Sequence, residues 1–233
     1  MSIEQIKVLK LGFLLSAGGS AFAEAVKRSR LPRESCHVVT DRYCGAIEKA
    51  DSLGITNEIV CENERLDFSK KAHAAFRASG CDFIVMQFSR LVSAYLYDHI
   101  LTINLHPSLL PAFPGLSAVG KAHSFRSPIQ GATLHIADSG VDTGPVLAQT
   151  VMSVPLNISL EQRLSIAHRQ KVVLLLALIE WMWAGRINPA SVRLDAFDLA
   201  GLQHSAVCSP GFETDDMRLQ AHEALDPFSR AGL

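Results

Sequence analysis

Residues 104–115 read NLHPSLLPAFPG and join an apolar segment to a loop rich in proline. Asn104 and His106 are alternate residues, so in a strand their side chains point to the same face of the sheet. The prolines of the stretch each fix a backbone φ angle and disfavour helix at the preceding residue. We therefore predict a strand that ends in a rigid, extended loop, which is where α/β proteins usually build their active sites.

A second stretch, DSGVDTG at residues 138–144, places Asp142 between two glycines that allow tight turns. If the fold brings Asp142 beside His106, the chain has a carboxylate, an imidazole and the amide donor of Asn104 in one place. Such a set can stabilise an oxyanion and move a proton. A single histidine after a strand is usually structural. The combined pattern N-x-H-P-S-L-L-P and D-x-G-x-D-T-G-P is too specific for that interpretation, and we predict a catalytic role.

Apolar runs alternate with helical patterns along the first half of the chain. This alternation is typical of a doubly wound, mostly parallel sheet with helices on both faces, a Rossmann-like α/β fold. The second half continues the sheet and then forms one long helix, which we expect Ser159 and Glu161 to open. A helix that starts at Ser20, as its N-cap, follows the turn after the first strand. We predict strands at residues 6–15, 36–40, 55–61, 82–88, 101–105, 130–137 and 145–155, and helices at 20–30, 44–53, 67–79, 120–126 and 159–184.

Composition excludes several classes of function. The chain has 233 residues, of which 48% are hydrophobic, and a net charge of −1, so no global field points to nucleic acid or a membrane. The apolar run at residues 172–179 is too short to span a bilayer. The five cysteines form no C-x-x-C pair and no H-x-x-x-H spacing occurs, so we expect free thiols, a cytoplasmic location and no metal.

We divide the chain into a catalytic domain at residues 1–187 and a C-terminal extension at 188–233 of unassigned role. In the extension, residues 191–199 could hold a strand and residues 215–225 a short helix. The sequence leaves the oligomeric state open between a monomer and a homodimer.

The two quoted stretches resemble the folate-dependent formyltransferases, and the resemblance covers roughly residues 7–187. Those members that formylate glycinamide ribonucleotide in purine synthesis are the most similar. The resemblance implies transfer of a formyl group from 10-formyltetrahydrofolate to a primary amine without a metal. It also implies that Asn104 and a protonated His106 stabilise the oxyanion, while Asp142 raises the pKa of His106 and helps to move a proton.

The same resemblance implies two binding regions, and both contain departures from the family pattern. Where the family has S-G-N-G-S-N in its phosphate loop, this chain has SAGGSA at residues 16–21, and Lys171 replaces a glutamate of the long helix. The implied folate-binding residues are Arg65, Arg90, Leu91, Val92, Asn104 and His135. The implied amine-substrate residues are Gly18, Gly19, Ser20, Pro107 and Lys171.

These departures leave alternatives open for the acceptor. The chain could formylate another amine, such as an amino sugar or an amino acid derivative, with Lys171 holding an anionic group. It could hydrolyse 10-formyltetrahydrofolate, or bind folate without turnover. An ordinary dinucleotide-binding domain is the alternative for the fold, but the first strand is not followed by G-x-G-x-x-G.

Overall fold

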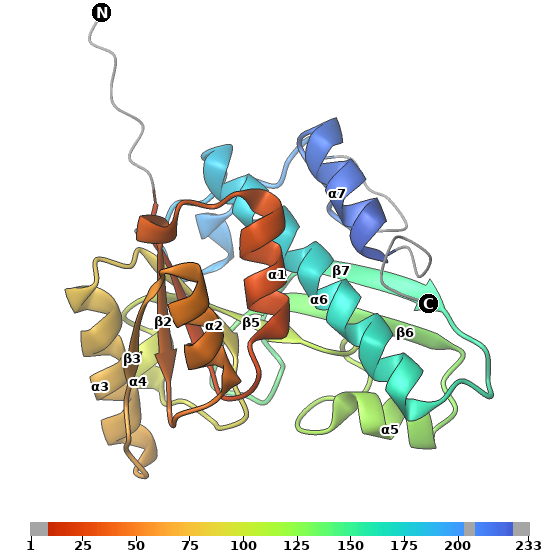
Figure 1. Cartoon of the computed structure of the whole chain (residues 1–233), viewed down its shortest axis with the longest axis horizontal. Helices are drawn as coiled ribbons and strands as arrows, with labels where there is room; N and C mark the ends of the chain where they lie inside the picture. Colours follow the sequence, from red (N-terminus) through yellow and green to blue (C-terminus); the bar gives the residue numbers. More distant parts are fainter. Residues whose placement is uncertain (1–8, 203–207, 226–233) are drawn as a thin grey trace, which may run out of the picture.

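A seven-stranded sheet in the order β3-β2-β1-β4-β5-β6-β7 forms the centre of the computed structural model, which describes residues 9–202 and 208–225 (Figure 1). Strands β1 to β5 are parallel to one another, while β6 pairs antiparallel with both β5 and β7. The predicted mostly parallel sheet is confirmed, although residues 6–8 of the first expected strand lie outside the described residues. The strands are β1 Leu11–Leu15, β2 Cys36–Thr40, β3 Thr56–Ile59, β4 Phe83–Gln87, β5 Leu101–His106, β6 Ile129–Ile136 and β7 Val146–Ser153.

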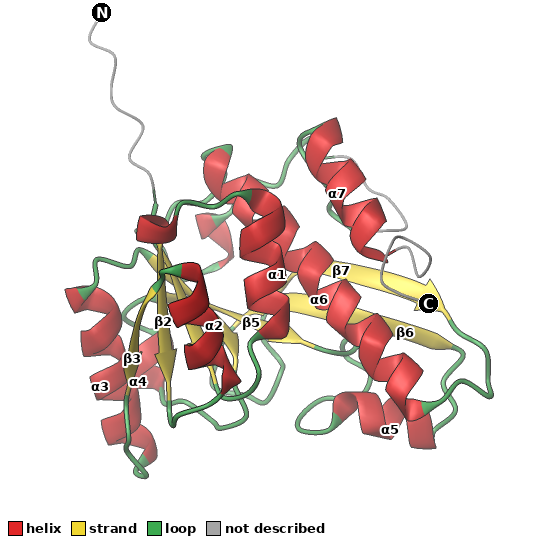
Figure 2. Cartoon of the chain, viewed as in Figure 1, coloured by secondary structure: helices red, strands yellow, loops and turns green. Residues whose placement is uncertain are grey.

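Helices cover both faces of this sheet, as predicted, and the alternation of apolar residues along β1 shows why. Phe13 and Leu15 pack in one apolar cluster with residues of α1, α2, α6 and α7, whereas Leu14 packs in another with residues of α3 and α4. In Figure 2, α1 and α6 lie side by side in front of the yellow strands. The helices are α1 Ser20–Ser29, α2 Gly45–Leu53, α3 Arg65–Ala78, α4 Ala94–Tyr97, α5 Ala118–Ser124, α6 Leu160–Trp183 and α7 Asp215–Leu225, with 3-10 turns η1 Arg33–Ser35 and η2 Leu194–Ala196.

The start of α1 differs from the prediction in detail, whereas that of α6 agrees with it. Gly19 is the N-cap of α1 and has a left-handed backbone (φ 62°), so Ser20 is the first helical residue and not the cap. Its hydroxyl instead lies 3.2 Å from Nδ1 of His168 on α6. Ser159 caps α6 and Glu161 lies in its first turn, as predicted, and Gln162 completes a capping box with Ser159.

The C-terminal extension contains the predicted helix α7 but not the predicted strand. Residues 191–199 form a turn that includes η2, because their backbone pairs with the segment just before them. Asn188 N–H donates to the carbonyl of Ala196, and Asp198 N–H donates to the carbonyl of Arg186. These local hydrogen bonds use backbone N–H and carbonyl groups that a strand would need for pairing at a sheet edge.

The extension packs against α6 and β7. Side chains of Leu202, Phe212, Met217 and Ala221 belong to the same apolar cluster as α6. The indole N–H of Trp181 donates to the carbonyl of Gly211. No helix within residues 9–202 or 208–225 is long and apolar enough to cross a membrane.

Candidate active site

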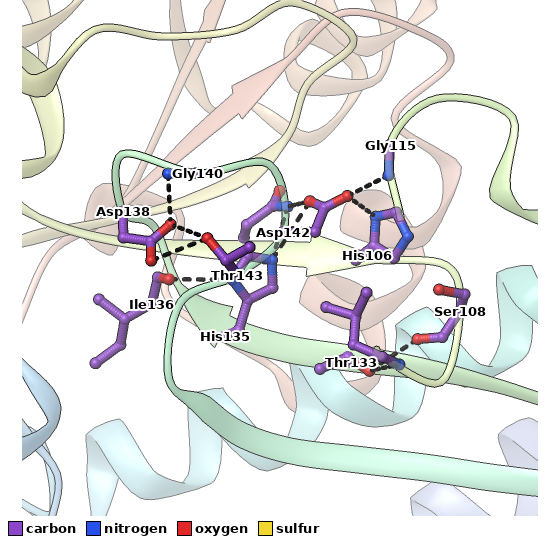
Figure 3. Close-up of polar contacts among 12 residues, drawn as sticks. His106, Ser108, Gly115, Thr133, His135, Ile136, Asp138, Gly140, Asp142 and Thr143 are labelled. Carbon is purple, nitrogen blue, oxygen red and sulfur yellow. Dashed lines mark hydrogen bonds and ion pairs between the residues drawn. The ribbon is translucent and has the colours of Figure 1, made fainter. Parts of the chain in front are cut away.

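Strand β5 ends at His106, and the proline-containing loop that follows folds back over this histidine. Ser108 shapes the loop, because its hydroxyl donates to the carbonyl oxygens of Ala112 (2.6 Å) and Phe113 (3.2 Å). Phe113 has a positive φ of 54°, an uncommon conformation for a bulky residue. His106 is only 5% exposed, and Figure 3 shows its ring beside Gly115 of this loop and Asp142.

Both ring nitrogens of His106 face oxygen atoms. Nε2 lies 3.0 Å from the carbonyl oxygen of Phe113, and Nδ1 lies 3.2 Å from Oδ2 of Asp142. A carbonyl oxygen can only accept a hydrogen bond, so Nε2 carries a proton in the neutral ring. The nitrogen that gains or loses a proton is therefore Nδ1, the one beside Asp142.

Asp142 receives hydrogen bonds on both carboxylate oxygens. Oδ1 accepts from the side-chain amide of Asn104 at 3.0 Å, and Oδ2 accepts from the N–H of Gly115 at 2.6 Å. Burial of the carboxyl group favours the neutral acid, but His135, the Gly115 N–H and His106 together lower the pKa of Asp142 to about 2. Asp142 is thus a carboxylate throughout the neutral pH range.

Asp142 raises the pKa of His106, as predicted, but this effect is not the largest one. Burial lowers the pKa of His106 more than the Phe113 carbonyl and the Asp142 carboxylate raise it, so its pKa lies below the ordinary value of 6.5. The charge of Asp142 is already shared among several donors, which weakens its pull on the imidazole. The resting histidine is therefore mostly neutral at pH 7.

Asn104 and His135 face each other across the β5–β6 pair and complete the cluster. Nδ1 of His135 donates to the carbonyl of Ile136 at 3.0 Å, which leaves Nε2 of the neutral ring as an acceptor. The amide nitrogen of Asn104 lies 3.0 Å from this Nε2, so its two hydrogens bridge His135 and Asp142. The predicted donation from Asn104 to an oxyanion requires it to release one of these partners.

The 138–144 stretch forms the turn that presents Asp142. Asp138 accepts hydrogen bonds from the N–H of Gly140 and the hydroxyl of Thr143 (Figure 3). A Cβ atom at Gly144 would collide with the carbonyl of Ile136, so only glycine permits this close approach to β6. Asp142 itself has a φ of 56°, a left-handed conformation that aspartate tolerates better than most residues.

Comparison with known proteins identifies the family. The family model described as formyl transferase matches residues 9–177. The chain belongs to the formyl transferase family. It is 31% identical over 157 residues to a phosphoribosylglycinamide formyltransferase of Mycobacterium tuberculosis. This match covers 64% of this chain and 73% of the relative.

Solved structures of formyl transferases have the same fold. Glycinamide ribonucleotide transformylase 1 of Symbiobacterium toebii is 26% identical, with a TM-score of 0.70 over 82% of this chain and 95% of that one. A formyltetrahydrofolate deformylase of Pseudomonas syringae is 18% identical, with a TM-score of 0.69 over 82% of this chain and 66% of that one. At this lower identity the likeness to the deformylase shows the fold alone.

The residues predicted for the folate side lie around the ends of β4 and β5. Arg65 is the first residue of α3, and its guanidinium donates twice to the carbonyl of Val92, at 2.6 and 2.9 Å. Val92 is buried, whereas Leu91 is 57% exposed. Arg90 donates to the carbonyl of Asn63 and lines a cavity of about 610 Å³, together with Asp41, Arg42, Cys61, Glu62 and Asn63.

The residues predicted for the amine substrate lie at the start of α1 and along α6. A Cβ atom at Gly18 would meet no atom within 4 Å, so this part of the turn is open. Ser20 contacts His168, whose other nitrogen lies 2.8 Å from Glu24. This hydrogen bond with His168, opposed by burial and aided by Arg28, lowers the pKa of Glu24 to about 2.

Lys171 lies on α6, one helical turn beyond His168. It is half-buried, and burial lowers the pKa of its ammonium group. Its side chain has no polar partner among the described residues. Pro107, the other predicted substrate residue, is half-buried at the start of the loop.

Several site residues escaped the sequence-based prediction. The Phe113 carbonyl and the Gly115 N–H act through backbone atoms, which leave no signature in residue type. Thr133 on β6 bonds the loop after β5, and only the strand register could have indicated it. Within the described ranges, no three histidine, cysteine, aspartate or glutamate side chains lie close enough to hold a metal ion.

Proposed function

We propose that this chain transfers a formyl group from 10-formyltetrahydrofolate to the amine of glycinamide ribonucleotide. The observation that carries the proposal is the convergence of Asn104, His106 and Asp142 at the end of β5 in a member of the formyl transferase family. The relatives named for phosphoribosylglycinamide support this acceptor.

The folate co-substrate would lie along the carboxyl ends of β4 and β5. The backbone of residues 89–93 offers an edge of donors and acceptors that suits a pterin ring, which carries amide-like groups. Arg65 fixes this edge through the Val92 carbonyl, and Arg90 adds positive charge beside the neighbouring cavity. Leu91, Val92 and His135 provide the remaining walls.

The reaction forms one C–N bond and breaks another. The acceptor amine attacks the formyl carbon, the carbonyl oxygen becomes an oxyanion, and the bond from carbon to the folate nitrogen then breaks. One proton must leave the attacking amine, and one must reach the departing folate nitrogen. Donors that point at the oxyanion lower the barrier, and the side-chain amide of Asn104 would take this role by releasing His135 or Asp142.

The geometry of His106 indicates how the proton moves. Nδ1 of the resting, neutral ring takes the proton of the attacking amine, because Nε2 is already protonated and bonded to Phe113. The Asp142 carboxylate, 3.2 Å away, stabilises the imidazolium that forms. The same Nδ1–H then transfers its proton to the departing folate nitrogen as the bond from carbon to that nitrogen breaks, which returns His106 to its neutral form.

A second candidate acceptor is supported by one observation. Lys171 is a half-buried ammonium group without a polar partner in the described part of the chain, and Ala21 replaces the asparagine that the family resemblance implies. An amino sugar or amino acid derivative with an anionic group would supply the polar partner that the Lys171 ammonium lacks.

The test is an absorbance assay that follows loss of 10-formyltetrahydrofolate, without an acceptor and then with glycinamide ribonucleotide. Turnover that requires the ribonucleotide supports the proposal. Turnover without any acceptor would show a hydrolase. No turnover in either condition, with folate still bound, would exclude glycinamide ribonucleotide and direct the search to amino sugars and amino acids.

A further inference from the structure

A single row of residues crosses the sheet from the active site to the C-terminal extension. His106 on β5 pairs with Thr133 on β6, and Thr133 pairs with Gln149 on β7. Ser209 of the extension then forms an isolated bridge with Gln149. Paired residues on neighbouring strands direct their side chains to the same face, so the first three share one side of the sheet.

Each of these three side chains bonds the loop that follows β5. His106 Nε2 donates to the carbonyl of Phe113. The Thr133 hydroxyl donates to the carbonyl of Ser108 at 2.7 Å and accepts from the N–H of Leu110 at 3.1 Å. Gln149 Nε2 donates to the carbonyl of Leu110 at 2.9 Å and to the Thr133 hydroxyl at 3.1 Å. The loop is therefore attached to the row at three successive points.

The loop also lies directly on β6. A Cβ atom at Gly131 would stand 2.9 Å from the Cβ of Leu109, so the Leu109 side chain packs against β6 where glycine leaves room for it. A loop this close has little freedom to shift without breaking its bonds to Thr133 and Gln149. Its position then determines where the Phe113 carbonyl stands relative to His106.

The backbone of Gln149 is held from the other side by the extension. The N–H of Gln149 donates to the carbonyl of Ser209, and the N–H of Ser209 donates to the carbonyl of Gln149, both at 2.9 Å. This pair of hydrogen bonds covers the outer edge of β7 at the one residue whose side chain bonds the loop. The extension thus stabilises the position from which Gln149 acts.

We propose that Gln149 is a positioning residue for formyl transfer, which holds the 108–113 loop so that the Phe113 carbonyl orients His106. The expected effect on kcat rests on the proposed function. The expected effect on the position of the loop rests only on the loop contacts. Gln149 bonds none of the residues assigned to the chemistry, so its effect must pass through Leu110 and Thr133.

The test variant is Gln149→Met, which keeps the length of the side chain and removes the amide donor. Loss of both hydrogen bonds from Gln149 Nε2, followed by misorientation of His106, should lower kcat about fivefold to tenfold with little change in the Kd for folate. The control is Thr150→Val on the same strand. Thr150 is buried, its hydroxyl has no partner in the structure, and it points to the opposite face.

Two readouts need no substrate and separate this inference from the proposed function. We expect faster amide hydrogen exchange at Leu110 and Ala112, and a shifted NMR titration of His106, in Gln149→Met but not in Thr150→Val. The charged or titratable groups that act on His106 are Asp142, His135 and Lys121, and neither variant alters them. Gln149→Leu, which also lacks the donor and adds no charge, replaces the methionine variant if that one fails to fold.

Loop exchange and a His106 titration equal to wild type in both Gln149 variants would overturn the inference. A wild-type chain that shows no transfer to glycinamide ribonucleotide would overturn the proposed acceptor instead. The exchange and titration data would still decide the role of Gln149 in that case.

Discussion

The carbonyl oxygen of Phe113 lies 3.0 Å from Nε2 of His106, within the loop that begins at that histidine. This contact fixes which nitrogen carries the proton in the neutral ring and leaves Nδ1 facing Asp142. It also explains why the loop buries the imidazole so deeply. The lowered pKa of His106 favours a neutral histidine beside an ionised carboxylate at the start of the reaction.

The pH dependence of kcat should report this neutral base. The pKa of His106 lies below 6.5, and protonation of Nδ1 removes the proton acceptor, so the rate falls as the pH decreases through that value. Between pH 7 and 8 the rate should be nearly constant, because Asp142, with a pKa of about 2, stays ionised. A kcat that increases on acidification from pH 8 to 6.5 would show instead that the imidazolium is the active form.

Asp142→Asn and His106→Ala should each lower kcat by about 10² to 10⁴-fold while the chain folds normally. The asparagine cannot stabilise an imidazolium and cannot accept from both Asn104 and Gly115 as the carboxylate does. Steady-state kinetics with circular dichroism checks both variants, and Asp98→Asn at an exposed position is the control. Rates similar to wild type in either variant would remove that residue from the mechanism.

Lys171→Met tests the acceptor side of the site. If the ammonium binds an anionic group of the acceptor, its loss should raise the acceptor KM about tenfold or more, since a charged hydrogen bond contributes about 1.5–3 kcal/mol. The Kd for folate should not change. Lys71→Met, on the exposed surface of α3 and paired with Glu62, is the matched control. An unchanged acceptor KM would mean that Lys171 faces no charged part of the substrate.

Glu180→Gln should destabilise the attachment of the extension. The Glu180 carboxylate is 3% exposed and accepts from Glu213 N–H, Thr214 N–H and the Thr214 hydroxyl at 2.6–2.7 Å, just before α7 begins. An amide presents one acceptor oxygen fewer to these donors, so we expect a loss of about 2–3 kcal/mol in the free energy of unfolding.

Urea denaturation measures this loss. Glu161→Gln, an exposed position in the first turn of α6, should change the free energy of unfolding by less than about 0.5 kcal/mol. Equal effects of the two substitutions would show that the Glu180 carboxylate does not stabilise the attachment of the extension.

Much of the fold could be predicted because the spacing of apolar residues and the positions of turn-forming residues agree along the first half of the chain. Continuous apolar strands such as β4, bounded by glycine turns and helices, leave few alternatives to a parallel sheet. Alternation in 104–106 correctly placed Asn104 and His106 on one face. The glycines of 138–144 correctly indicated a turn that presents Asp142.

The rest depended on three-dimensional contacts. The pKa of His106 is set by burial under a loop whose path follows from Ser108, Thr133 and Gln149, none of which has a local signal. The strand expected at residues 191–199 failed because its backbone bonds the preceding turn. Helix α4, with only four residues, is too short for a periodic pattern to show.

The measurement that tests the central claim most directly is the fate of the formyl group itself. The enzyme would be incubated with 10-formyltetrahydrofolate carrying a ¹³C-labelled formyl carbon and with glycinamide ribonucleotide, and both products would be examined by mass spectrometry. We predict labelled N-formyl ribonucleotide in amounts equal to the tetrahydrofolate released, and at least about a hundredfold less in the same time from Asp142→Asn. Label recovered as free formate, with the ribonucleotide unchanged, would contradict the claim.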